Sequence, residues 1–113
     1  MAEYELSPAA ERDLLEIAIY TISTWSAKQA DQYAAALERH FVAIGRGSAR
    51  ARVLLEHRPE LLVSRCEHHY VFFVKREQDG PLILAVLHED MDLMAQVRDR
   101  SDAPPTPPPV HGT

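Results

Sequence analysis

Two helical patterns follow one another with almost no linker near the start of the chain, and this limits how it can fold. Ser7-Pro8 favours a helix start, because serine caps a helix N-terminus and proline suits the first helical position. Apolar residues then recur at helical spacing as far as Thr24-Trp25. The pattern Ser26-Ala27-Lys28-Gln29 is a capping box that starts a second helix. Two helices joined so closely must fold back on each other as a hairpin.

The apolar stripes of these two helices predict a large part of the core. In the second helix the apolar residues step by four, three, four and three positions, the clearest helical pattern in the chain. Gly45 and Gly47 then provide stop signals for this helix. The helical residues that we expect in the core are Leu14, Ile17, Trp25, Leu37 and Phe41.

After Ser48 the sequence changes to strand patterns. A short strand is predicted at Val53–Leu55, and two longer ones, rich in branched and aromatic residues, at Leu61–Cys66 and Tyr70–Arg76. An Asp-Gly turn follows them, and such a turn favours hairpin geometry. The chain then returns as a continuous apolar strand over Leu82–His88.

These elements predict an α+β fold in a single domain. A short strand at Glu3–Leu6 comes first and the helical hairpin follows. The later strands then form a mostly antiparallel sheet of three to four strands with both helices on one face. The strand residues expected in the core are Phe72, Leu84 and Val86. We expect the domain to span residues 1–101, with a short final helix at Leu93–Arg98. The proline-rich residues 102–113 are expected to form a disordered tail.

Charge and cysteine content exclude several classes of protein. The formal net charge is −5, which disfavours specific nucleic-acid binding, since phosphate contacts need a strong basic surface. The single cysteine rules out an internal disulfide. The chain starts with neither a basic nor an apolar leader and has no apolar run long enough to span a membrane. We therefore expect a cytoplasmic protein.

Polar groups begin abruptly at the end of the last predicted strand. The apolar run from Leu82 to Leu87 gives way to His88-Glu89-Asp90-Met91-Asp92. A core strand that ends in ionisable groups places chemistry or binding at the edge of the sheet.

Several short motifs occur in a fixed order along Tyr4–Asp92. The most specific is Leu87-His88 followed by Met91-Asp92 after an apolar strand. The others are Leu6-Ser7-Pro8-Ala9-Ala10, Asp13-Leu14, Ile17, Tyr20, Trp25, Ala30, Arg65 and Tyr70-Val71-Phe72-Phe73. This ordered set resembles the ParE branch of the RelE/ParE toxin superfamily, which belongs to bacterial toxin–antitoxin modules of the plasmid stabilisation type.

The resemblance implies a bacterial toxin that acts by binding. ParE-type members inhibit DNA gyrase and are neutralised by a ParD-like antitoxin in a hetero-oligomeric complex, without a cofactor. The antitoxin is expected to lay an amphipathic helix or an extended strand against exposed apolar surface. The residues that we expect to contact a target or partner are Arg65, Tyr70, His88, Met91 and Asp92.

Two alternatives remain open at this point. RelE-type members cleave messenger RNA on the ribosome, and His88 as acid or base with Arg65 as phosphate clamp would form such a site. Against this, Glu89-Asp90 would repel a phosphate backbone, and the last strand carries no basic residue. The other alternative is a member that has lost toxicity and only binds the antitoxin.

No metal site is expected. Cys66, His68 and His69 are potential ligands, but neighbouring strand residues point to opposite faces, so Cys66 and His69 should not converge. No second Cys/His pair lies at zinc spacing. Asp13 is expected to be a solvated carboxylate in the first turn of its helix.

Overall fold

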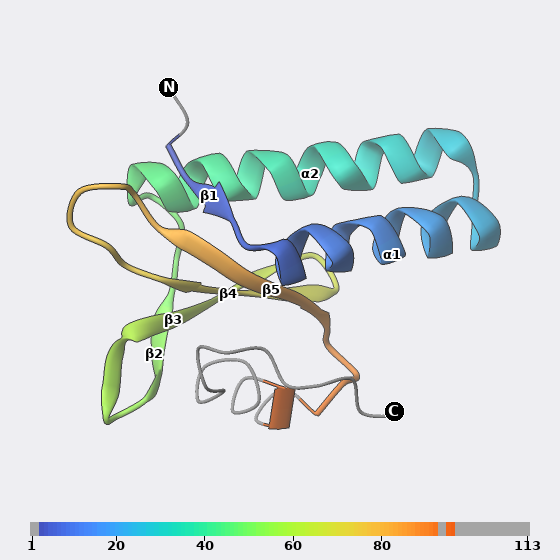
Figure 1. The fold of residues 1–113 in the computed structure, drawn as a ribbon. Helices are drawn as coiled ribbons and strands as arrows, with labels where there is room; N and C mark the ends of the chain where they lie inside the picture. Colours follow the sequence, from blue (N-terminus) through green and yellow to red (C-terminus); the bar gives the residue numbers. More distant parts are fainter. Residues whose placement is uncertain (1–2, 93–94, 97–113) are drawn as a thin grey trace.

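A computed structural model describes residues 3–92 and 95–96 of the chain (Figure 1). Two helices, α1 (Pro8–Thr24) and α2 (Ala27–Arg46), form the predicted hairpin. Within the described residues the sheet has five strands in the order β1-β5-β4-β3-β2. Their bounds are Glu5–Leu6 for β1, Arg52–Leu55 for β2, Arg58–Cys66 for β3, His69–Val74 for β4 and Leu82–His88 for β5.

The predicted α+β class is confirmed: the four later strands form an antiparallel sheet, and the predicted N-terminal strand joins it as the fifth. The first strand pairs parallel with β5, whereas the other neighbouring strands pair antiparallel. Figure 1 shows both helices on one side of the sheet. Neither described helix is long and apolar enough to cross a membrane. The helix predicted at Leu93–Arg98 and the tail predicted at 102–113 fall largely or wholly outside the described residues.

Both helices start where their capping residues predict. The Ser7 hydroxyl accepts a hydrogen bond from the Ala10 backbone amide at 3.0 Å, and the Ser26 hydroxyl accepts one from the Gln29 amide at 3.1 Å. These bonds satisfy backbone donors that have no partner in the first turn of a helix. The local sequence is therefore sufficient to set both helix starts.

The end of α2 differs from the prediction at one glycine. Gly47 is the C-cap with φ of +76°, a left-handed conformation that glycine adopts at little cost. Gly45 does not stop the helix and lies inside it. A Cβ atom at Gly45 would come within 2.5 Å of the Glu3 carbonyl oxygen. The missing side chain lets the N-terminal segment pack against α2, where the Arg46 Nε atom lies 3.0 Å from a Glu3 carboxylate oxygen.

Apolar side chains gather in two clusters, because alternate residues of each strand face opposite sides of the sheet. One cluster joins α2 to the sheet, and the other gathers Leu61, Val63, Phe72, Ala85 and Leu87. Among the residues expected in the core, Leu37, Phe41, Phe72 and Val86 are buried. Three more are partly buried against these clusters, namely Leu14, Ile17 and Leu84.

The assignment of Trp25 to the core is wrong. This residue is the C-cap of α1, and it is 60% exposed. All residues from 22 to 29, which form the far end of the hairpin, are exposed. Helical spacing identified the apolar side of α1 but not how far along the helix the rest of the fold covers it.

The backbone edge of β5 is covered by α1 where β1 ends. The Ser7 hydroxyl donates a hydrogen bond to the Leu84 carbonyl oxygen at 3.2 Å, and the Val86 amide donates one to an Asp13 carboxylate oxygen at 2.9 Å. Asp13 is therefore not the solvated carboxylate that the sequence suggested. It satisfies a strand donor that a longer β1 would otherwise have paired.

Candidate interaction surfaces

The turn between β3 and β4 gathers ionisable groups at one end of the sheet. Its two residues, Glu67 and His68, place Cys66 opposite His69. Glu67 has φ of +57°, a region that non-glycine residues seldom occupy. The expectation that Cys66 and His69 point to opposite faces is wrong, because the turn makes them cross-strand partners. No group of three or more potential metal ligands is found among the described residues.

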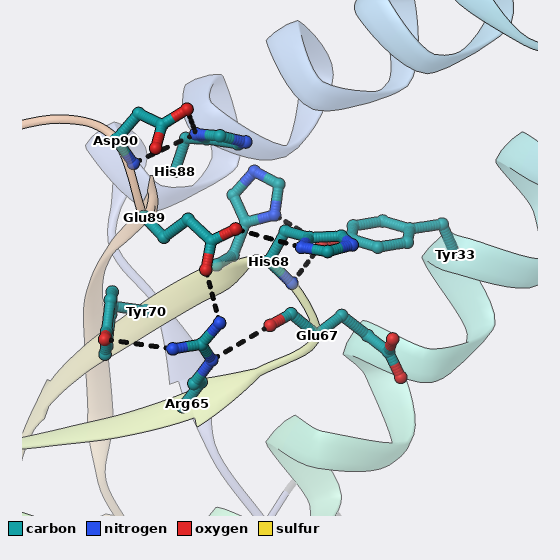
Figure 2. A network of polar contacts seen from close by, with 9 residues as sticks. Tyr33, Arg65, Glu67, His68, Tyr70, His88, Glu89 and Asp90 are labelled. Atoms are coloured by element: carbon teal, nitrogen blue, oxygen red, sulfur yellow. Dashed lines mark hydrogen bonds and ion pairs between the residues drawn. The ribbon is translucent and has the colours of Figure 1, made fainter.

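Glu89, just after β5, contacts both Arg65 of β3 and His68 of the turn (Figure 2). Its carboxylate forms an ion pair with the Arg65 guanidinium, and its second oxygen lies 3.0 Å from the His68 Nδ1 atom. The hydrogen bond from His68 is the main cause that lowers the pKa of Glu89. Arg65 also donates to the Tyr70 hydroxyl at 3.3 Å and to the Glu67 carbonyl oxygen at 3.2 Å. These contacts hold the guanidinium over the Tyr70 ring, 5.4 Å from its centroid.

Tyr33 connects α2 to the same turn. Its hydroxyl lies 2.5 Å from the His69 Nδ1 atom and accepts a hydrogen bond from the His68 backbone amide at 3.1 Å. Burial, followed by the nearby His88, lowers the pKa of His69 to about 4. His69 is therefore neutral near pH 7, and with its proton on Nε2 the Nδ1 atom accepts a hydrogen bond from the Tyr33 hydroxyl. The His69 and His88 rings meet edge to face, with centroids 5.3 Å apart. We call the set Arg65, His68, His69, Tyr70, His88 and Glu89 the strand-end cluster.

The remaining contact candidates lie after β5. The His88 Nδ1 atom accepts a hydrogen bond from the Asp90 amide at 3.1 Å, while the His88 side chain stays 43% exposed. Met91 and Asp92 are exposed. The Asp92 carboxylate accepts a hydrogen bond from the Ala95 amide at 3.2 Å. The five candidates named from the sequence thus share one end of the sheet, and Arg65 and Tyr70 contact each other directly.

Arg65 and His88, the pair required for ribonuclease chemistry, project from opposite faces of the sheet. Arg65 pairs with Tyr70, and Tyr70 pairs with Leu87. His88 is the next residue along β5 and pairs with His69, in the row that faces the other way. Figure 2 likewise shows the two side chains well apart. A phosphate would also have to displace a carboxylate from the Arg65 guanidinium.

The second candidate surface is the side of α1 that faces away from α2 and the sheet. Leu15, Ile19 and Ile22 follow the spacing i, i+4, i+7 and share one side of the helix, and Trp25 continues it. These four side chains are 56–61% exposed, although each is large and apolar. We call them the α1 outer face. Within α1 only Ala10 is buried, and Leu14 and Ile17 are partly buried against the core, whereas the α1 outer face stays exposed.

An open apolar cavity of about 280 Å³ lies between α1 and α2. We call it the hairpin groove. Ala18 and Leu14 line it from α1, and Tyr33 and Ala34 line it from α2. Since Ala18 lies one helical turn from Ile22, the groove adjoins the α1 outer face.

Sequence reasoning missed two parts of these surfaces. Tyr33 falls within the apolar stripe of α2, and a tyrosine in such a stripe indicates that its hydroxyl meets a polar partner. That signal was present but was not used. Glu89 was assigned only a repulsive effect on phosphate, because its pairing with Arg65 and His68 depends on strand register, which single-sequence patterns do not fix.

Comparisons with known proteins agree with this fold. Residues 4–93 match the family model described as the ParE toxin of the type II toxin–antitoxin system parDE. The chain is 41% identical over 100 residues to a protein named Toxin ParE from Escherichia coli, covering 88% of this chain and 97% of that one. A solved structure titled Chromosomal ParDE TA system from P. aeruginosa has the same fold. Its TM-score is 0.63 at 12% identity, over 75% of this chain and 92% of that chain. The chain therefore belongs to the ParE toxin family of type II toxin–antitoxin systems.

Proposed function

We propose that this ParE-family toxin inhibits DNA gyrase by binding and is neutralised by a ParD-like antitoxin. The observation that carries binding rather than catalysis is the placement of Arg65 and His88 on opposite faces, with Arg65 paired to Glu89. Gyrase as the target follows from the resemblance to ParE-type members.

The antitoxin docks on the α1 outer face and the adjoining hairpin groove. The α1 outer face exposes large apolar side chains along one side of the helix, and exposed apolar patches of this kind mark protein interfaces. The fitting occupant is an amphipathic helix of the antitoxin, with apolar residues spaced to meet Leu15, Ile19 and Ile22. The related fold from P. aeruginosa was solved for a ParDE system, which supports an antitoxin as the partner.

The strand-end cluster, with Met91 and Asp92, contacts the target. Its neighbourhood is acidic, because Glu67, Asp90 and Asp92 add to the Glu89 carboxylate, which is already paired with Arg65. This charge suits a basic protein surface and not a nucleic-acid backbone. The cluster is separate from the α1 outer face, so antitoxin and target have different primary contacts.

A supercoiling assay with purified gyrase tests this function. Saturating toxin should abolish supercoiling, and stoichiometric antitoxin should restore it. The matched variants are Met91→Ala, which removes an exposed target contact, and Tyr20→Phe, which alters an exposed residue of α1 away from the strand ends. The first should weaken inhibition and the second should not. Undiminished supercoiling at saturating toxin, or messenger RNA cleavage on ribosomes without gyrase inhibition, would contradict the proposal.

A further inference from the structure

Tyr33 belongs to both candidate surfaces. It lines the hairpin groove, and its hydroxyl reaches the turn between β3 and β4. Figure 2 shows the side chain extending from α2 toward His68. One residue thus lines the proposed antitoxin site and contacts the strand-end cluster at its hydroxyl.

A continuous series of polar contacts leads from this hydroxyl to Arg65. The His68 amide donates to the Tyr33 hydroxyl at 3.1 Å, and the His68 ring lies 3.0 Å from the Glu89 carboxylate. Glu89 in turn pairs with Arg65, which lies over the Tyr70 ring. Each step is a direct contact, so a shift of the turn changes the position of the guanidinium.

We propose that Tyr33 is a positioning residue through which an antitoxin segment in the hairpin groove alters the strand-end cluster. The inference rests on the proposed function, because it takes the antitoxin as the occupant of the groove. Neutralisation then has two parts: the antitoxin covers the α1 outer face, and it also displaces the side chains that contact the target.

The physical basis is that the Tyr33 hydroxyl contacts both His68 and His69, while Tyr33 also lines a groove that a ligand can enter. His69 is 9% exposed, so water cannot readily replace the Tyr33 hydroxyl at its Nδ1 atom. A ligand that tilts the Tyr33 ring must therefore either carry His68 and His69 with it or leave a buried acceptor without a donor. In the first case the β3–β4 turn moves, and in the second the protonation state of His69 changes. The coupling is reciprocal, so a change at the cluster also alters affinity in the groove.

The pKa of His69 is a measurable sign of its contact with the Tyr33 hydroxyl. Several titratable groups face or surround its ring: Tyr33 from α2, Asp13 from α1, Cys66 and His68 from the β3–β4 hairpin, and His88 and Glu89 from the end of β5. Among these, the Tyr33 hydroxyl donates to the neutral ring and so favours it. Removing the hydroxyl should raise the pKa of His69 from its value of about 4.

The first arm of the test uses the free toxin with isotope-labelled histidine rings. Nuclear magnetic resonance titration should show a higher pKa for His69 in Tyr33→Phe than in the unmodified chain. Tyr20→Phe is the matched control, because Tyr20 is an exposed tyrosine of α1, and it should leave the titration unchanged. An unchanged His69 titration in Tyr33→Phe would overturn the inference at its first step.

The second arm adds the C-terminal segment of the antitoxin encoded beside the toxin gene. Binding should shift the signals of Leu15 and Ile19 and also those of the His68 and His69 rings. In Tyr33→Phe the α1 signals should still shift, while the histidine signals should move at most one third as far. Equal histidine shifts in both proteins would overturn the role of Tyr33.

Two further outcomes separate this inference from the proposed function. Shifted α1 signals with unmoved histidine signals in the unmodified chain would leave the docking site in place and reject the coupling alone. Unmoved α1 signals at saturating segment would reject the docking site and the coupling together.

Discussion

The two helices of the hairpin look alike in sequence but differ in what covers them. Both begin after a serine that caps the helix N-terminus, and both carry long apolar stripes. The second helix buries Ala30, Leu37, Phe41 and Ile44, whereas the first buries Ala10 alone. The apolar residues of α2 are therefore buried in the core of the fold, whereas those of the α1 outer face are available to a partner. Apolar periodicity predicts that a surface will be covered, without saying whether the same chain covers it.

The largest expected effect comes from shortening one apolar side chain in each helix to alanine. Phe41→Ala in α2 should lower the free energy of unfolding by about 3–5 kcal/mol, because it leaves a cavity in the core. Ile19→Ala on the α1 outer face should change it by less than about 0.5 kcal/mol. Urea denaturation of both variants measures the contrast. Similar losses in the two helices would show that the α1 outer face also supports the fold.

The second test uses pH, because both helices contribute a group near His69. Burial lowers the pKa of His69 from 6.5 in the unfolded chain to about 4 in the fold. Between these values the unfolded state binds more protons, so stability is full above pH 6.5 and falls as the pH drops toward 4. The loss should reach up to about 3 kcal/mol. Denaturation at pH 7, 5.5 and 4 measures it, and His69→Gln should flatten the dependence; an equal slope in that variant would contradict the assignment.

The third test separates binding from stability on α1. Leu15→Glu should weaken antitoxin binding by about 2 kcal/mol, since it places a charge within an apolar interface. Thr24→Glu adds the same charge to an exposed position of α1 outside the α1 outer face and should leave affinity nearly unchanged. Isothermal titration with the antitoxin gives both values. Equal weakening by the two variants would indicate a general charge effect instead of a docking face.

The smallest effect concerns the hydrogen bond by which α1 covers the edge of β5. Asp13→Ala removes the acceptor for the Val86 amide and should cost about 1 kcal/mol of stability. Asp31→Ala, at an exposed position of α2, is the matched control and should cost less. Hydrogen exchange at Val86 should also become faster in Asp13→Ala only. Unchanged exchange there would mean that another group protects the strand edge.

The sequence predicted those features that depend on neighbours along the chain. Ser7 and Ser26 start the helices because their caps are local, and the apolar run of β5 is buried because its composition leaves no other place for it. Trp25 and Gly45 were misread because their roles depend on how far the hairpin extends and on the approach of Glu3. Both are properties of the tertiary fold.

The candidate site was less accessible to prediction for a related reason. The five contact candidates lie at one end of the sheet, but their partners Tyr33 and Glu89 were not recognised from the sequence. These contacts join segments 20 to 40 residues apart in sequence and need the strand register to bring them together. The same register separates Arg65 from His88, a distinction that no local motif contains.

The parallel pairing of β1 with β5 also affects when the toxin can fold during its synthesis. In the part of the chain that the structure describes, β1 joins the sheet by pairing with β5, and Ser7 and Asp13 form hydrogen bonds to β5 as well. At about 5–20 residues per second, several seconds pass between the emergence of these partners from the ribosome. During that interval β1 and α1 lack their partner strand, and β4 has no neighbour on the side that β5 later takes. The native contacts of β1, Ser7 and Asp13 therefore cannot form before β5 has emerged, which places completion of the fold near the end of synthesis of the described residues.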